Sequence, residues 1–393
     1  MAARDESLGH GPDEAPHSSA PSSGTALPLA LLVAAVLLLG TGTPPTTQVL
    51  YLLVVSVLLI ASLRFSIGKL AIPVLFLLGV HLRYAYTGGG SDVLDVVAAA
   101  IAEMDAGGNP YGHGYAASTP PGAPYAYGPI PLLWYRITEP ARLELLVSSV
   151  ILALLALRGR PLGLAIYAAA PAFILTAADG SNDTSAGAFL LVALLVAARS
   201  PTAGGSMIAL AAAFKPYAVA WLPPLLAFGG IAGPLAGFTL GTLATWGPAV
   251  LIWGPRSVLT SFQLSDLAHR VPYYSLLYAL SLDGPGAREL FERGRYVVGI
   301  MLAAGSWLVV RSARSMMLWG CALFFVTLFF GFWSTFAYVA AIAPLICWHV
   351  DEWLGLADQR VRWSGDPVGH VAAWVDARWP VRSRAGTPRI IGP

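Results

Sequence analysis

Hydrophobic and polar positions along this chain alternate in long blocks rather than in the short periods of a soluble domain. Repeated apolar runs of spanning length are separated by short polar turns. The pattern predicts an all-α integral membrane protein, a helical bundle of about 10–12 transmembrane segments. The apolar runs that predict these segments cover residues 26–39, 48–63, 70–84, 143–157, 162–176, 187–198, 206–228, 234–253, 296–310, 316–332 and 336–349.

One stretch, residues 91–135, interrupts this alternation. Its first part, residues 92–105, places its valines, Ala100 and Met104 on one helical face and its carboxylates off that face. This predicts an amphipathic helix that lies in the membrane interface rather than across the membrane. Two glycines end the helix, and a long loop rich in Pro, Gly and Tyr follows. Loops of this length in compact proteins are usually functional or disordered, and the many aromatics here favour an ordered, functional loop.

Basic residues mark one side of the predicted bundle. Arginines end the apolar runs at residues 64, 158–160, 199 and 311–314, and the C-terminal tail is rich in arginine. The positive-inside rule places all of these in the cytoplasm and the 91–135 loop outside it. We therefore expect a multi-pass plasma-membrane protein with both termini cytoplasmic. It would comprise a disordered tail (1–24), a transmembrane domain (25–350) and a basic tail (351–393).

Two cations occur within apolar runs. Arg83 lies near the end of its run, where it either snorkels to the interface or faces the site, and we expect it to snorkel. Lys215 lies in the middle of run 206–228 and is followed by Pro216, which disfavours helix at this point. This run is either one span or a helical hairpin with Lys215 at its apex. Broken backbone at membrane depth is tolerated only beside a cavity or within protein, which favours the hairpin.

Composition supports the membrane assignment and excludes several functions. Hydrophobic residues make up 56% and charged residues only 11% of the 393-residue chain, against about 25% charged in soluble domains. The net charge is +2 without a basic, aromatic-interleaved patch, so we expect no nucleic-acid partner. The two cysteines lie in apolar runs and are expected to be buried hydrophobic side chains. The acidic residues do not cluster, so no metal site is predicted.

Asp92 and Asp95 are the first candidates for chemistry. Both lie at the start of the predicted amphipathic helix, where a carboxylate caps free backbone N–H groups. A carboxylate that faces a cavity at the membrane boundary can instead act as a general base toward a hydroxyl. Both interpretations remain open for both residues.

Lys215 is the second candidate, because a lysine in hydrocarbon usually marks a functional site or an ion pair. As a point cation it suits a phosphate. His269 and Arg270, in the predicted outer loop, either clamp an anion or belong to a solvated loop face. Asp183 either caps the next helix or binds a sugar hydroxyl.

Three segments resemble glycosyltransferase family 87, which belongs to the GT-C superfamily of polyprenyl-phosphate-sugar-dependent transferases. The run DVLDVVAAAIAEMDAGGNPY with the later YAYGPIPLLW is similar to the family's first extracytoplasmic loop. The segment ARSPTAGGSMIALAAAFKPYAVAWLPPLLAF is similar to its hairpin with a central Lys-Pro. FWSTFAYVAAIAPL matches a late segment more weakly.

The resemblance implies a GT-C fold whose cavity opens to the outer side, with roles for particular residues. The family's catalytic Asp maps to Asp92, but Val96 stands where the family often has Tyr, so Asp95 stays an alternative. The family's Lys maps to Lys215 and would face the donor phosphate, with Arg270 or His269 assisting. Aromatic residues of the loop would stack on sugar faces; the tyrosines expected to do so are Tyr111, Tyr125 and Tyr127.

The implied activity is transfer of mannose or arabinofuranose from a polyprenyl-phosphate donor to a hydroxyl of a cell-envelope glycan or glycolipid. No cofactor is expected beyond this lipid-linked donor, since the chain has no Gly-rich nucleotide motif. A composition rich in Ala and Arg indicates a high-GC genome, such as that of an actinobacterium. The alternatives are a transporter or flippase of a lipid-linked sugar, which should show internally repeated halves, and a non-catalytic homologue.

Overall fold

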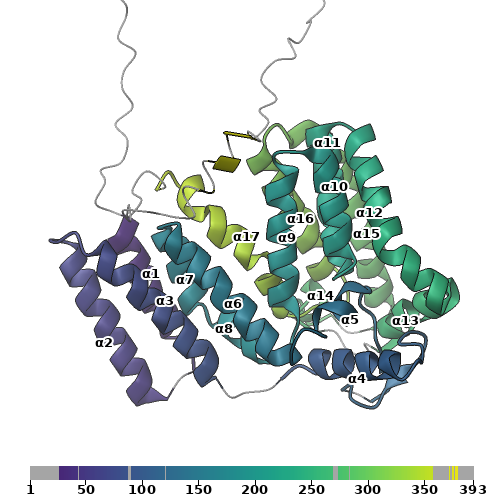
Figure 1. Ribbon diagram of the computed structural model, residues 1–393, viewed down its shortest axis with the longest axis horizontal. Coiled ribbons are helices and arrows are strands. Elements are labelled where there is room, and N and C mark those ends of the chain that lie inside the picture. The colour runs from purple at the N-terminus through teal and green to yellow at the C-terminus, as the bar shows by residue number, and fades with distance from the viewer. Residues whose placement is uncertain are drawn as a thin grey trace, which may run out of the picture.

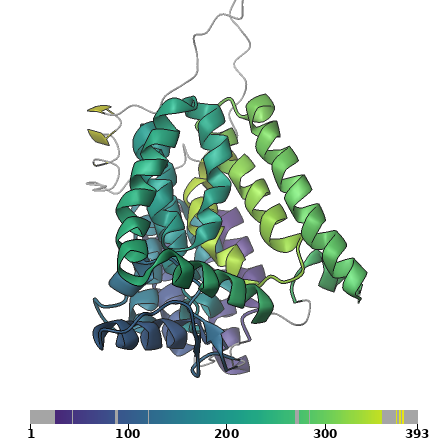
Figure 2. The ribbon, with the colours of Figure 1, turned by 90° about the vertical axis from the view of Figure 1, so that its right-hand side faces the viewer.

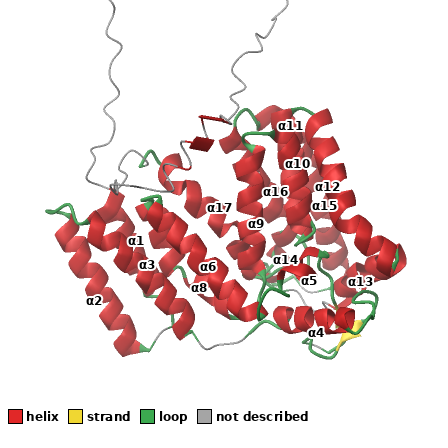
Figure 3. Ribbon diagram, viewed as in Figure 1, coloured by secondary structure: helices red, strands yellow, loops and turns green. Residues whose placement is uncertain are grey.

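The computed structural model is a helical bundle with one two-stranded sheet (Figure 1, Figure 3). It describes residues 26–42, 44–86, 90–119, 121–268, 273–282 and 284–356, together with 371, 374–375 and 377–378. The predicted tail 1–24 and most of the predicted tail 351–393 lie outside these residues. The first elements are α1 (Ala26–Leu38), α2 (Pro45–Ser62), α3 (Gly68–Ala85), α4 (Val93–Asp105), β1 (Gly114–Tyr115), β2 (Ala123–Pro124), α5 (Ile130–Trp134), α6 (Pro140–Leu157), α7 (Pro161–Ala169), α8 (Pro171–Ala178) and α9 (Asp183–Ala197). The later elements are α10 (Pro201–Ala212), the 3₁₀ helix η1 (Pro216–Trp221), α11 (Leu222–Gly229), α12 (Ala232–Trp253), α13 (Pro255–Ala268), α14 (Leu276–Ala279), α15 (Pro285–Val309), α16 (Ala313–Phe329) and α17 (Ala337–Trp353).

The length and apolarity of several helices indicate a membrane protein. Within the described residues, α3, α6 and α12 are each long and apolar enough to cross a bilayer, and the bent pair α7 and α8 can form a fourth span. Shorter apolar helices of 10–17 residues accompany them. Helix α12 directs large apolar side chains outward, with Leu251 87% exposed. An outward apolar surface of this kind is stable when lipid covers it.

The predicted span 162–176 is broken in the structure, and Arg83 explains how the break is tolerated. Helices α7 and α8 meet at Pro171 with a bend of 59°. The Arg83 guanidinium donates to the carbonyl of Tyr167 at 2.6 Å and to that of Ala168 at 3.4 Å. Arg83 is therefore fully buried, and the prediction that it snorkels is wrong. Its guanidinium donates hydrogen bonds to carbonyls that the broken helix leaves without helical partners.

The run 206–228 forms the predicted hairpin. Helix α10 ends at Ala212, Lys215 is extended (φ −137°, ψ 125°), and η1 with α11 returns along α10. Both open ends lie together, since a Cβ added at Gly229 would meet Pro201 at 2.2 Å. Lys215 is thus at the apex, on the same end of the bundle as α4.

Residues 91–135 form a layer across that end of the bundle. Helix α4 lies across the ends of the upright helices in both views (Figure 1, Figure 2). Its buried face and the loop tyrosines form a hydrophobic core separate from the main one. The layer is fixed to the bundle by Asn109, which donates to the Trp253 carbonyl at 3.2 Å, and by the Gly112 N–H, which donates to Ser261 at 2.8 Å.

Helix α15 differs most from its predicted bounds. The sequence predicts a span that begins at residue 296, but the helix begins at Pro285. The eleven additional residues, 285–295, form its polar first turns. A search for apolar runs detects only the later part of such a helix, because the charged residues lower the mean hydropathy of its first turns. These extra turns bring three charged side chains, Arg288, Glu292 and Arg295, to a cavity at the hairpin apex.

Candidate functional site

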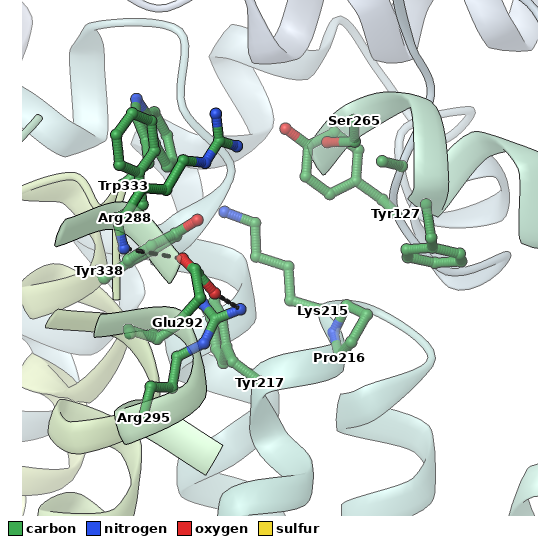
Figure 4. Close-up of a pocket in the computed structure, with 14 residues that line it drawn as sticks. Tyr127, Lys215, Pro216, Tyr217, Ser265, Arg288, Glu292, Arg295, Trp333 and Tyr338 are labelled. Carbon is green, nitrogen blue, oxygen red and sulfur yellow. Dashed lines mark hydrogen bonds and ion pairs between the residues drawn. The ribbon is translucent and has the colours of Figure 1, made fainter. Parts of the chain in front are cut away.

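A cavity of about 270 Å³ opens at the apex of the hairpin (Figure 4). Lys215 and Tyr127 reach into it from one wall, and Arg288 and Trp333 line the other. Helix α13 contributes Ser265 beside Tyr127. The remaining lining residues are Ala126, Pro216, Tyr217, Phe262, Glu292, Arg295, Leu328, Phe332 and Tyr338. Charged and aromatic groups therefore surround a space whose walls come from five separate parts of the chain.

Lys215 is held by a buried ion pair and by aromatic rings. Its Nζ lies 2.7 Å from Asp183 Oδ1, and both side chains are buried. The Tyr217 hydroxyl donates to the same oxygen at 3.0 Å. The ammonium also lies 5.5 Å from the Tyr127 ring centroid and 5.6 Å from that of Tyr338. Asp183 thus neutralises the lysine, and the ammonium is fixed in position rather than left as an isolated charge.

The first turns of α15 add a second charged group to the cavity. Arg288, Glu292 and Arg295 lie on one helical face at spacings of four and three residues. Arg295 pairs with Glu292 at 2.5 Å, and Glu292 also accepts the Phe332 N–H at 2.8 Å. The Arg288 guanidinium stacks on the Phe332 ring at 4.1 Å. Lys215 and Arg295 each pair with a carboxylate, and Arg288 lines the same cavity with its guanidinium against an aromatic ring, so these cations favour an anionic ligand.

Asp92 does not line the cavity, but it is close enough to Tyr127, which does, to raise the pKa of that hydroxyl. Asp92 precedes α4, and its side chain makes no capping hydrogen bond to that helix. Its Oδ2 instead accepts the backbone N–H of Thr119 in the loop. The start of α4 is tied to the turn before Asp183, because Ser91 donates to the Asp179 carbonyl at 2.9 Å. The capping interpretation is therefore wrong for Asp92, and the carboxylate faces the loop that carries Tyr127.

Tyr127 is close enough to Asp92 and Asp183 to feel both charges, and its ring lies beside the Lys215 ammonium. Burial raises the pKa of its hydroxyl well above the ordinary value, and the nearby Tyr338, Asp183 and Asp92 raise this pKa further. The hydroxyl therefore keeps its proton at neutral pH. A neutral hydroxyl among acidic groups can donate a hydrogen bond to a ligand oxygen in the cavity.

Of the other predicted site residues, those that the structure describes lie away from the cavity. Asp95 is exposed on the outer face of α4. Tyr111 and Tyr125 are buried in the core of the loop, where their rings contact each other at 5.3 Å. Their hydroxyls donate to the carbonyls of Tyr127 and Gly128, so both shape the loop and neither lines the cavity. His269 and Arg270 lie outside the described residues.

The sequence contained a signal for the residues that the prediction missed. Arg288, Glu292 and Arg295 precede the predicted span 296–310 and were given no role, yet their spacing puts them on one face of a helix that continues directly into that apolar run. Trp333 and Phe262 gave no comparable signal, since an aromatic residue beside an apolar run is usual in membrane proteins.

Gly128 allows the loop to approach the hairpin apex. A Cβ at this position would lie 1.9 Å from the Ala213 carbonyl oxygen, two residues before Lys215. We expect Gly128→Ala to displace Tyr127 and to lower the free energy of unfolding by about 1–3 kcal/mol, the usual cost of overpacking. Gly247→Ala in α12 is the control, since nothing lies within 4 Å of its added Cβ. Thermal unfolding of both variants measures the difference, and equal stabilities would contradict the close approach.

Comparisons with known proteins give no family for this chain, so its function is argued from the geometry of the site. Neither a scan against protein-family models nor searches of curated proteins and of solved structures find a match to this chain. Among the described residues, no group of three or more His, Cys, Asp or Glu side chains is placed to hold a metal ion.

Proposed function

We propose that this protein is a membrane glycosyltransferase of the GT-C type that resembles family 87. It would transfer a sugar, mannose or arabinofuranose, from a polyprenyl-phosphate donor to a hydroxyl of a cell-envelope glycan or glycolipid. The observation that carries the proposal is the cavity at the hairpin apex, where the cations Lys215 and Arg288, aromatic rings and a neighbouring carboxylate meet. Its volume of about 270 Å³ suits a sugar-phosphate head group rather than a polyprenyl tail.

In an inverting transfer, residues in and beside the cavity would bind the donor phosphate, remove the acceptor's proton and contact the sugar. Arg288 and Lys215 would bind the donor phosphate and stabilise the charge that develops on it as the sugar–phosphate bond breaks. Asp92 would take the proton of the acceptor hydroxyl while the oxygen of that hydroxyl attacks the anomeric carbon of the sugar. The products are the glycosylated acceptor and polyprenyl phosphate. Tyr127, Trp333 and Tyr338 would contact the faces of the sugar.

The orientation of the protein is part of the proposal. The ends of α6, α9 and α15 away from the cavity carry Arg158, Arg199 and Arg311. By the positive-inside rule this end would face the cytoplasm and the cavity would open on the outer side. A polyprenyl-phosphate donor that has been flipped outward would be available there.

The experiment is transfer of radiolabelled sugar by purified protein in lipid, with polyprenyl-phospho-mannose and polyprenyl-phospho-arabinose offered separately. Mixed cell-envelope glycolipids serve as acceptors. We expect label in a product with one donor, which also names the sugar. No label with either donor, in a preparation that binds the donor, would favour transport instead. The broken pair α7 and α8 and the buried Lys215 are features that transporters share.

Arg288 supplies a test of the anion site that the sequence did not offer. We expect Arg288→Gln to weaken donor binding about 10- to 100-fold, because a hydrogen bond to a charged group contributes about 1.5–3 kcal/mol. Arg293→Gln changes the same charge on an exposed face of the same helix and should leave binding unchanged. Titration of the protein with the unlabelled donor measures both affinities, and equal losses would show a general charge effect.

A further inference from the structure

One carboxylate of the apex cavity takes no part in the proposed transfer steps. Among the described residues that line this cavity, Glu292 is the only Asp or Glu, since Asp92 and Asp183 lie outside its lining. Glu292 lies between Arg288 and Arg295 on the first turns of α15 (Figure 4). This carboxylate would repel an anion that has no hydrogen-bond donors. A carboxylate among the cations of the cavity therefore indicates a ligand that carries hydroxyl groups as well as negative charge.

Two partners hold the Glu292 carboxylate in a fixed orientation. Its Oε2 pairs with the Arg295 guanidinium at 2.5 Å, and its Oε1 accepts the Phe332 N–H at 2.8 Å. The neighbouring backbone packs directly on this pair, because a Cβ added at Gly331 would lie 2.9 Å from Arg295 Nη1 and 3.1 Å from Glu292 Oε1. The Glu292 side chain is still 25% exposed. A side chain that is already ordered loses little entropy when a ligand binds to it.

The Glu292 carboxylate keeps the capacity to accept more hydrogen bonds. A carboxylate has about four lone-pair positions and no donor, and one partner from the described part of the chain lies on each oxygen. Two neighbouring hydroxyls of a sugar ring can therefore donate side by side, one to each oxygen. Hydrogen bonds to an ionised acceptor are about twice as strong as those between neutral groups.

The surroundings of Glu292 fit a sugar that is joined to a phosphate. Arg288 precedes it by four residues, which is about 6 Å along the helix axis at 1.5 Å per residue. Trp333 and Tyr338 line the same cavity and offer ring faces to the C–H groups of a sugar. A phosphate bound at Arg288 would thus place the attached sugar ring within reach of Glu292.

We propose that Glu292 recognises the donor sugar by accepting hydrogen bonds from two adjacent ring hydroxyls, while Arg288 and Lys215 hold the phosphate. This inference rests on the proposed function and names the group that contacts the hydroxyls of the transferred sugar. The contact also distinguishes the donor from the product, because polyprenyl phosphate has no sugar hydroxyl to offer to Glu292.

The affinities of the purified protein in lipid for the sugar-bearing donor and for polyprenyl phosphate test this contact. We expect Glu292→Gln to weaken binding of the donor about 10- to 100-fold, the usual effect of losing hydrogen bonds to a charged group, and not to weaken binding of polyprenyl phosphate. Glutamine keeps an oxygen for the Phe332 N–H, so this segment should stay in place. The matched control Glu289→Gln breaks an exposed pair with Arg293 on the same helix and should alter neither affinity.

Donor analogues that each lack one ring hydroxyl locate the contact on the sugar. Two adjacent deletions should each weaken binding to the unmodified protein about 10-fold, and Glu292→Gln should weaken binding of those two analogues much less than binding of the complete donor. Glu292→Asp keeps the charge and withdraws both oxygens by one carbon. It should also lose the donor selectively, and it replaces Glu292→Gln if that variant does not fold.

The possible outcomes separate this inference from the proposed function. Equal losses for the donor and for polyprenyl phosphate in Glu292→Gln, or no loss for either, would overturn the contact and leave the proposed transfer standing. An unmodified protein that binds neither ligand would overturn both. Selective loss of the donor, in a protein that transfers no sugar, would support the contact at Glu292 and overturn the transfer.

Discussion

Asp92→Asn is expected to abolish sugar transfer while the protein stays folded. The substitution removes the charge that accepts the acceptor's proton, and a general base contributes about 10²–10⁴-fold to the rate. Asparagine keeps the shape of the side chain and an oxygen that can accept the Thr119 N–H, so the loop should keep its place. The radiolabel transfer assay in lipid measures the loss, and thermal unfolding shows that the fold remains.

Asp95→Asn is the matched control for this prediction. It makes the same chemical change three residues later on the same helix, at an exposed side chain. We expect turnover close to that of the unmodified protein. The opposite result, with Asp95→Asn inactive and Asp92→Asn active, would move the base to Asp95 and show that α4 turns its other face to the acceptor.

Lys215→Met is expected to damage both stability and donor binding. It leaves Asp183 buried without its cation, and breaking a buried pair in this manner costs about 3–5 kcal/mol. It also removes a cation from the cavity that would hold the donor phosphate. The free energy of unfolding and the affinity for the donor are the two measurements. Lys69→Met, at the only other lysine, changes an exposed side chain and should alter neither.

A double substitution separates the structural from the functional role of Lys215. In Asp183→Asn with Lys215→Met no charge is left unpaired, so most of the lost stability should return. Donor binding should stay weak, because the cation is still absent. Recovery of donor binding together with stability would show that Lys215 only holds Asp183 and its helix in place.

The elements of the fold were predictable where the signal is local. The amphipathic helix predicted over 92–105 is α4, Val93–Asp105, because its period and the glycines that end it act within a few turns. The hairpin at Lys215 followed from Pro216, which lacks an N–H and disfavours helix at the residue before it. The break between α7 and α8 was not predicted, since the helix resumes at once after Pro171 and the apolar run continues.

The sequence by itself determined an all-α membrane protein, the polar layer over 91–135, and Lys215 and Asp92 as its notable charges. These depend on hydropathy and on single Pro and Gly residues, which act on their neighbours in the chain. Only the tertiary structure decided which groups meet. The pairing of Lys215 with Asp183, the arrival of Arg288 and the burial of Tyr111 join residues far apart in sequence. Such contacts depend on how the helices pack, and no local pattern in the chain encodes that packing.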